Sequence, residues 1–401
     1  MQLKKRFLYY NLVKYLNHKN SLVITGMRQV GKTTLMKQLF ETVENSKIWF
    51  DFDNPLDTLI FENSNYDAVY FDLLKNCGGK QNTQLFVFID EIQNFPDITK
   101  IIKYHIDKYN VKYIVTGSSN YYLRNLFPES LSGRKFLFVL SPMDFKEFLY
   151  FKNQIGKIED IDYNINSDFK KCSQYEYKKF EFFFNEFFEF GGFPEVVVTE
   201  NHDTKKKILK NIFSSFFEKD VKLLTDLKDI KDLRDLILLL AARTGNILDV
   251  SKLSSEMGIN RVKMYSLLEL LQGVFFVKLI PKFSKSIDRS VAGRRKVYFA
   301  DNGLLNTISR LNESQLFENA VANQLEKYGE LSYYNLRNTS EIDFILNKSI
   351  AFEVKLNAVK RDVERLKKIS ERLGINSYYV ISKSYVDLEN TIFWLYPPAF
   401  Q

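Results

Sequence analysis

A glycine-rich segment, GMRQVGKT at residues 26–33, constrains this chain of 401 residues more than any other feature. It lies between the apolar run SLVIT and the periodic segment KTTLMKQLFETV, which predict a strand and a helix. The backbone N–H groups of such a loop converge at the helix N-terminus, where the helix dipole adds positive potential. The pattern G-x-x-x-x-G-K-[ST] in this context therefore predicts a parallel α/β sheet with a phosphate-binding loop.

The residues of this loop have separate expected roles. Gly26 opens the loop, Gly31 permits close approach of the backbone, and Lys32 reaches the terminal phosphates. The Thr33 hydroxyl is placed to ligate Mg²⁺. The expected cofactors are therefore ATP and Mg²⁺. The other residues expected to line the nucleotide are Arg28, Gln29, Val30 and Thr34.

A second signal is the apolar stretch FVFIDE at residues 86–91, which predicts a strand ending in two carboxylates. Asp90 is expected to hold Mg²⁺, through water or through Thr33, and Glu91 to act as the general base for the attacking water. The alternative is a strand followed by a solvated acidic turn. Two adjacent acids favour ATP hydrolysis over GTP switching, because GTPases usually carry one acid followed by glycine.

Two further residues are candidates for the same site. Ser118 follows the predicted strand KYIVTG, and a polar residue at the end of a neighbouring strand can contact the γ-phosphate or the water. Arg134 in SGRKF is the candidate arginine finger, because a cation favours the charge that develops during hydrolysis. A plain surface arginine is the alternative interpretation.

Six segments in a fixed order carry a resemblance to a known family: GMRQVGKTTLM, FIDEIQ, TGSS, LSGR, LSPMDFKEFL and GGFPEVV. In this order they resemble the AAA-type ATPases that carry a C-terminal DUF4143 domain. The resemblance covers most of the chain and implies an AAA core with a short helical lid. It implies architecture more than activity.

The expected fold class is α/β with several domains. Strands alternating with helices up to residue 142 predict a P-loop ATPase core, and residues 143–240 read as a helical lid. Residues 241–298 are predicted to form a winged helix, and residues 299–401 a second α/β domain. No internal repeat is found.

The winged-helix prediction depends on the segment from Asp249 to Phe283. LSSEMGI predicts a short helix ended by Gly258, and Asn260 is a good N-cap for a second helix. The strands FFVKLIPKF and RRKVYF would form the wing. The second helix continues with apolar residues at Val262, Tyr265, Leu268 and Leu271.

The net charge of +8 is concentrated in residues 251–300, which hold ten Lys and Arg against three Asp and Glu, an excess of seven. This excess favours DNA as a partner, with contacts from Arg261 and Lys263. Winged helices also serve as spacers between proteins, and that is the alternative. The cations expected to decorate the wing are Lys282, Lys285, Arg289, Arg294 and Arg295.

The stretch TSEIDFILNKSIAFEVKLN predicts two strands that carry Asp343, Glu353 and Lys355. Glu353 and Lys355 share a strand face because side chains alternate with period two. The set resembles the PD-(D/E)XK nuclease signature, with Glu318 supplied by an upstream helix. Asp343, Glu353 and Glu318 are therefore candidate metal ligands, and Asp343, Glu353 and Lys355 candidate catalytic residues. The alternative is a salt-bridged hairpin.

Cysteine usage and hydropathy exclude other classes of protein. Cys77 and Cys172 stand at unrelated positions, which excludes a disulfide framework and a cysteine-based zinc site. The apolar run at residues 237–242 is too short to span a membrane, and a cytoplasmic protein is expected. A homo-oligomer, such as a ring or hexamer, is also expected. The function predicted is ATP-dependent action on branched or broken DNA; the alternative is a nucleotide-gated switch or scaffold for a protein partner.

Overall fold

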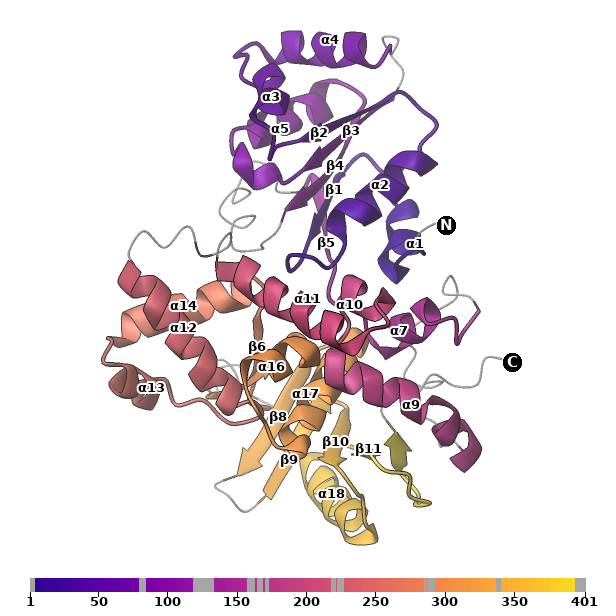
Figure 1. Cartoon of the computed structure of the whole chain (residues 1–401), viewed down its shortest axis with the longest axis vertical. Coiled ribbons are helices and arrows are strands. Elements are labelled where there is room, and N and C mark those ends of the chain that lie inside the picture. Colours follow the sequence, from indigo (N-terminus) through magenta and orange to yellow (C-terminus); the bar gives the residue numbers. More distant parts are fainter. Residues whose placement is uncertain are drawn as a thin grey trace. The chain divides into compact units, whose positions relative to one another are not determined.

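The computed structural model describes residues 4–78, 84–117, 133–156, 163, 169, 173–217, 221, 227–284, 286, 293–336 and 340–393. The chain divides into two compact units. The first covers the residues up to Ser141 together with Gly273–Phe275, and the second covers the rest of the chain (Figure 1). The predicted domain boundaries at residues 240 and 298 stay predictions.

The first unit is built on a sheet of five parallel strands in the order β2-β3-β4-β1-β5. This confirms the predicted parallel α/β core. The central strands β1, β3 and β4 are buried along their whole length, because both faces of a parallel sheet are covered. The strands are β1 (Ser21–Thr25), β2 (Lys47–Asp51), β3 (Leu85–Asp90), β4 (Val111–Gly117) and β5 (Lys135–Val139).

Helices connect these strands. The amphipathic α5 buries Ile98, Ile101 and Ile102 against the sheet, next to Val87 and Tyr113. The helices of this unit are α1 (Phe7–Val13), α2 (Lys32–Thr42), α3 (Pro55–Thr58), α4 (Tyr66–Asn76) and α5 (Ile98–Lys108), with 3-10 turns η1 (Leu59–Phe61) and η2 (Ile92–Asn94).

The second unit begins with helices, as predicted for the residues after 143. In α9 most aromatic side chains are buried, including Phe180, Phe184 and Phe187, so they form core rather than a surface for base stacking. The helices up to the predicted winged helix are α7 (Phe145–Phe151), α9 (Gln174–Phe190), α10 (Pro194–Val198), α11 (His202–Ser215) and α12 (Leu227–Ala242).

Two helices and a hairpin follow in the order predicted for a winged helix. α13 (Val250–Met257) ends at Gly258 with φ 64°, and the side chain of Asn260 accepts the N–H of Lys263 at 2.8 Å at the start of α14 (Arg261–Gly273). Strands β6 (Val277–Pro281) and β7 (Arg295–Phe299) pair antiparallel.

The four apolar residues noted in the sequence of α14 do not all lie in the core. Val262 and Tyr265 are 76 and 59% exposed, whereas Leu268 and Leu271 are buried. The buried residues Met264, Leu267, Leu268 and Leu271 are spaced by three or four positions and form one stripe along the helix, and Val262 and Tyr265 lie outside this stripe.

The C-terminal part is a five-stranded sheet in the order β12-β11-β10-β9-β8. The predicted hairpin is confirmed, since β9 and β10 pair antiparallel with Phe344 opposite Phe352. The elements α17, β8, β9, β10, α18 and β11 follow the predicted αβββαβ order. The elements are α16 (Asn302–Ile308), α17 (Glu313–Leu325), η4 (Glu326–Tyr328), β8 (Leu331–Leu336), β9 (Ser340–Leu346), β10 (Ile350–Lys355), α18 (Lys360–Leu373), β11 (Ser377–Ser382) and β12 (Thr391–Phe393).

A buried carboxylate joins distant segments of the second unit. Asp301 caps α16, where one oxygen accepts the N–H of Leu304 at 2.9 Å and the other accepts the N–H of Gly192 at 2.7 Å. Gly191 passes so close that a side chain there would meet the Asp301 carboxylate at 2.2 Å. Asp301 therefore holds the GGFP turn, between α9 and α10, against the start of α16.

We expect Asp301→Ala to lower the free energy of unfolding of the second unit by about 2–4 kcal/mol, because it leaves two buried N–H groups without acceptors. Urea unfolding of the full chain, with hydrogen exchange to assign the transition, measures the loss. Asn312→Ala is the matched control: it removes an exposed cap of α17, which accepts the N–H of Gln315, and should cost about 1 kcal/mol. Equal losses in the two variants would contradict the role of Asp301.

Candidate functional site

The glycine-rich loop joins β1 to α2. Gly31 has φ 94°, in the left-handed region that favours glycine. Gly26 leaves no room for a side chain, because a Cβ there would lie 2.0 Å from the carbonyl oxygen of Leu140. These two positions explain why the loop needs glycine at both ends of the motif, and they leave the start of α2 open to a phosphate.

The ammonium of Lys32 lies over the loop. It donates to the carbonyls of Gly26 at 3.0 Å and Met27 at 2.8 Å, and the residue is 6% exposed. Phosphate oxygens are acceptors of the same kind, so the loop fits the terminal phosphates of a nucleotide. Arg6, which the sequence analysis missed, donates to the carbonyls of Val30 and Ser141, both at 2.9 Å. One arginine in a basic N-terminal segment gives no sequence signal for this contact.

Asp90 ends β3 and is buried. Burial raises the pKa of its carboxyl group, and hydrogen bonds from the hydroxyls of Thr116 and Thr33 oppose this rise. The contact between Thr33 and Asp90 brings together two of the predicted ligands. Hydroxyl and carboxylate oxygens are the donors that Mg²⁺ prefers, so this pair fits the ion.

Glu91 follows Asp90 and has φ 52°. Its N–H donates to the hydroxyl oxygen of Thr116 at 3.3 Å, and its carboxylate accepts a hydrogen bond from the side-chain amide of Gln93. Thr116 therefore contacts both acids, the side chain of one and the backbone of the other. It can do so because β4 lies between β3 and β1 in the sheet.

Thr116 was missed as a site residue, although it stands two positions before Ser118 in the same segment. Alternation along β4 places every second side chain on one face, and without the strand order the sequence does not tell which hydroxyl faces β3. Ser118 itself lies outside the described residues.

Arg134 lies at the other end of the sheet. In the parallel pairing of β1 with β5, Ser21 stands opposite Lys135, so Arg134 is at the amino end whereas the loop follows the carboxyl end of β1. Its guanidinium contacts the carboxylate of Asp107 at 2.7 Å. Arg134 therefore does not reach the phosphate loop of its own chain. Its role as an arginine finger stays a prediction, in which it would act on the nucleotide of a second copy of the chain.

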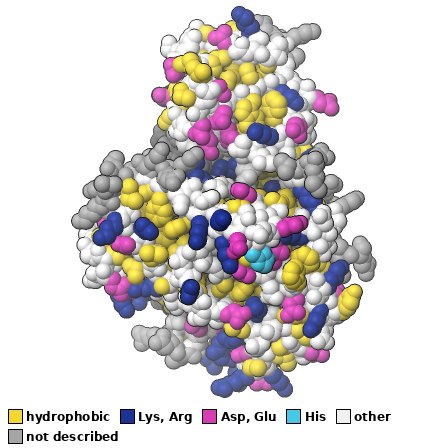
Figure 2. All heavy atoms as spheres, viewed as in Figure 1, with side chains coloured by type: hydrophobic (Ala, Val, Ile, Leu, Met, Phe, Trp, Pro, Cys, Tyr) yellow, Lys and Arg dark blue, Asp and Glu magenta, His cyan; other side chains and the backbone are white. Residues whose placement is uncertain are grey.

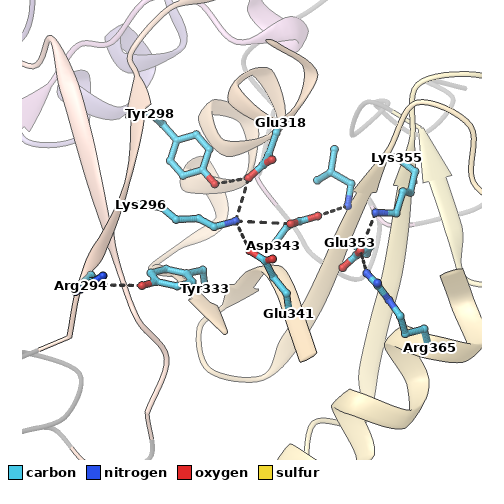
Figure 3. A network of polar contacts seen from close by, with 11 residues as sticks. Arg294, Lys296, Tyr298, Glu318, Tyr333, Glu341, Asp343, Glu353, Lys355 and Arg365 are labelled. Carbon is cyan, nitrogen blue, oxygen red and sulfur yellow. Dashed lines mark hydrogen bonds and ion pairs between the residues drawn. The ribbon is translucent and has the colours of Figure 1, made fainter. Parts of the chain in front are cut away.

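A second group of predicted residues lines a cavity of about 500 Å³ in the second unit. Asp343 on β9 and Glu353 on β10 both face it, and one oxygen of Asp343 accepts the N–H of Val354 at 2.9 Å (Figure 3). The residues that line it are Asn335, Ser340, Glu341, Asp343, Glu353, Lys355 and Arg365.

Glu353 has its own cations. Lys355 approaches it at 2.8 Å, and Arg365 of α18 also contacts it. Burial and the neighbouring Asp343 raise the pKa of Glu353 to about 7. Glu353 and Lys355 thus lie on the same face of β10 and form a salt bridge there.

Glu318 of α17 lies on the other side of Asp343. The hydroxyl of Tyr298 donates to it at 2.6 Å, and the ammonium of Lys296 lies 3.3 Å away. Burial and Asp343 raise the pKa of Glu318 to about 7. Among the described residues, no three His, Cys, Asp or Glu side chains are grouped so that they could hold a metal ion. The metal prediction for Glu318, Asp343 and Glu353 stays a prediction.

The predicted basic surface of residues 251–300 is smaller than its charge suggests. Lys296, one of the ten cations counted in this region, is buried among acids and does not contribute to the surface. Lys263 pairs with two aspartates, and Arg294 contacts Asp249 at 3.0 Å while staying 67% exposed. Arg261 and Arg295 are exposed. Lys285 and Arg289 lie outside the described residues.

Comparison with known families accounts for most of the chain. Residues 18–149 match an AAA domain, and residues 313–398 match a domain of unknown function, DUF4143. The chain therefore carries an AAA domain, which includes the glycine-rich loop, and a C-terminal DUF4143 domain. A further domain of unknown function, DUF8612, matches residues 182–315 and thus includes the predicted winged helix.

Relatives of the chain occur in archaea and bacteria. An uncharacterized protein of Methanocaldococcus jannaschii is 28% identical over 378 residues, which is 88% of this chain and 80% of that protein. An uncharacterized protein of Haemophilus influenzae is 28% identical over 360 residues, which is 85% of this chain and 84% of that protein.

Solved structures show a weaker likeness. A Walker-type ATPase of Pyrococcus abyssi aligns over 77% of this chain and 99% of its own, with 14% identity and a TM-score of 0.47. The Orc1 protein of Aeropyrum pernix, solved in complex with DNA, aligns over 81% of this chain and 95% of its own, with 13% identity and a TM-score of 0.30. Scores of this size support no conclusion about function. In the described part of the chain, every helix is too short or too polar to cross a membrane.

We expect Thr116→Val to lower the rate of ATP turnover by about tenfold to a hundredfold, because it removes a hydrogen bond to Asp90 and leaves the N–H of Glu91 without its acceptor. Phosphate release at saturating ATP measures the rate. Thr116→Ser should restore most of it. Thr99→Val removes another buried hydroxyl, on α5, and is the control. Unaltered turnover in Thr116→Val would show that the hydroxyl does not position the acids.

Proposed function

We propose that this chain hydrolyses ATP at the end of β1 and β3 and uses the reaction to act on DNA. The observation that carries the first part is that Thr116 contacts both Asp90 and Glu91, while Thr33 also contacts Asp90. Lys32 lies over the glycine-rich loop that leads to Thr33. We place the protein in the cytoplasm as a homo-oligomer, in which Arg134 of one copy would serve the nucleotide of another.

Each side chain would have one task in hydrolysis. Lys32, together with the loop N–H groups, would bind the terminal phosphates. Thr33 and Asp90 would hold Mg²⁺, which supplies positive charge next to the phosphates when bound. Glu91 would accept the proton of the attacking water, and Thr116 would hold Glu91 in place through its backbone.

The DNA part is supported by a basic helix beside the cavity. α18 carries six cations and three acids. Four of these cations are exposed and follow one another at intervals of three or four residues, so they share one side of the helix: Arg361, Arg365, Lys368 and Arg372. Arg365 on this side also lines the cavity. Figure 2 shows Lys and Arg side chains gathered at the bottom of the view, where Figure 1 places α18.

A phosphate backbone along α18 would pass the cavity that holds Asp343, Glu353 and Lys355. Mg²⁺-dependent cleavage by these residues is the finer part of the proposal, and branched or broken DNA is the proposed substrate. The second candidate function is a nucleotide-gated switch for a protein partner. Val262 and Tyr265 favour it, because two exposed apolar side chains on one helix suit a protein surface better than a phosphate backbone.

We expect Lys32→Ala to abolish tight ATP binding, because it removes the cation at the phosphates. Glu91→Gln should bind ATP but lower turnover by about a hundredfold or more, because an amide does not accept the proton of the water. Filter binding with radiolabelled ATP and phosphate release test both variants. Lys37→Ala, at an exposed cation on the same helix, is the control. A Glu91→Gln protein with unaltered turnover would remove Glu91 as the base.

We expect neutralisation of Arg361, Lys368 and Arg372 to glutamine to weaken DNA binding and to reduce the slope of affinity against salt by about 2–3, because each phosphate contact releases about one counterion. Gel shifts with linear, forked and four-way DNA, at several salt concentrations and with and without ATP, measure both. Lys206, Lys207 and Lys210 on α11 are exposed and give a control of equal charge change.

The wing of the predicted winged helix is tested in the same assay by neutralising Lys285, Arg294 and Arg295 together. A loss there without a loss in the α18 variant would move the DNA contact to the predicted winged helix. Unchanged binding in both variants would leave the protein partner as the better proposal.

A further inference from the structure

The ammonium of Lys296 lies among three carboxylates of the second unit. Its nitrogen is 2.9 Å from an oxygen of Glu341, 3.3 Å from Glu318 and 3.7 Å from Asp343 (Figure 3). The side chain of Lys296 is 4% exposed. A fully desolvated ammonium requires compensation by opposite charge, and these three acids supply it.

The cation and the acids come from different elements. Glu318 belongs to α17 and Glu341 and Asp343 to β9, whereas Lys296 is delivered by β7 of the hairpin. Burial alone would lower the pKa of Lys296, but the three carboxylates raise it, so the ammonium stays charged. The positive charge at this cluster is therefore supplied by β7, which carries none of the three acids.

The fold holds Lys296 in this place. Side chains alternate along β7, so Arg295 is exposed while Lys296 and Tyr298 lie on the opposite face. Both Lys296 and Tyr298 donate a hydrogen bond to Glu318. The ring of Tyr333 lies 5.6 Å from the Lys296 nitrogen, and its hydroxyl donates to the carbonyl of Arg294 at 2.8 Å. The strand and the side chain are thus both fixed against β8.

The cluster as it stands does not fit a divalent ion. Mg²⁺ and Mn²⁺ need several oxygens at about 2.0–2.2 Å, directed at one point. Here the point between Glu341, Glu318 and Asp343 is taken by an ammonium. Glu353, the remaining candidate ligand, is paired with Lys355 and Arg365 on the other side of Asp343.

We propose that Lys296 is the resident cation of this carboxylate cluster and excludes a divalent metal ion from it. This inference rests on the proposed function, since it concerns the metal dependence of the proposed nuclease-like site. It assigns Lys296 a specificity role: a metal ion enters only where the ammonium is removed, and cleavage that depends on such an ion would require the withdrawal of Lys296 from the acids.

The test is a calorimetric titration of the full chain with Mn²⁺, without nucleotide. Lys296→Met should bind Mn²⁺ at least about tenfold more tightly than the parent, because a positive charge a few ångströms from the ion is removed. Adding Asp343→Asn to this variant should abolish the gain, which assigns it to the cluster. Lys278→Met is the matched control, because Lys278 is a partly buried lysine of β6 that pairs with Glu326.

Stability provides a second measurement for the same variants. Lys296→Met leaves acids uncompensated, so its melting temperature should fall and should rise again with Mn²⁺, whereas that of the parent should not respond. If Lys296→Met does not fold even with Mn²⁺, the variant that also carries Glu341→Gln reduces the excess charge and is titrated instead.

The outcomes separate the inference from the proposed function. If the parent binds Mn²⁺ as tightly as Lys296→Met, and Asp343→Asn abolishes this binding, Lys296 excludes nothing, although the metal site itself stands. If neither protein binds Mn²⁺ at the cluster, both the inference and the metal-dependent site are wrong.

Discussion

The nucleotide site depends on the position of β4 between β3 and β1. This strand order brings the Thr116 hydroxyl to Asp90 and to the N–H of Glu91, while the loop after β1 lies one strand further along. Without the inserted strand, the acids would have no buried hydroxyl between them and the loop. The geometry of this candidate site is thus a property of the sheet, since rigid parallel strands fix the positions of the groups at their carboxyl ends.

The two units handle buried acids in different ways. In the first, Asp90 is buried beside the neutral hydroxyls of Thr33 and Thr116. In the second, every acid of the carboxylate cluster has a lysine or arginine close by. The acids that suggest a metal site in the sequence are thus largely paired with lysine and arginine, one of which, Lys296, comes from the hairpin of β6 and β7.

The surfaces available for a partner also differ from the distribution of charge along the chain. Much of the positive charge of residues 251–300 is taken up by contacts to acids within the second unit. In the sequence of α18, cations are interspersed with acids, but the helix presents four of its cations along one side. Exposure and neighbouring acids, rather than the count of lysines, decide where a polyanion can be bound.

The sequence by itself determined the glycine-rich loop, the strand that ends in Asp90 and Glu91, the parallel sheet and the hairpin of Asp343 and Glu353. In the loop, the strand end and the hairpin the interacting residues are close in the chain, so their geometry follows from local backbone preference and side-chain alternation. The parallel sheet was predicted from the alternation of strands and helices along the chain. Only the tertiary structure decided which hydroxyl meets Asp90, because Thr116 is 26 residues away on another strand. It also decided that Lys296 faces Glu318, 22 residues away, instead of solvent. Such pairings depend on which strands and helices lie side by side, and a charged side chain has the same sequence pattern whether water or a carboxylate surrounds it.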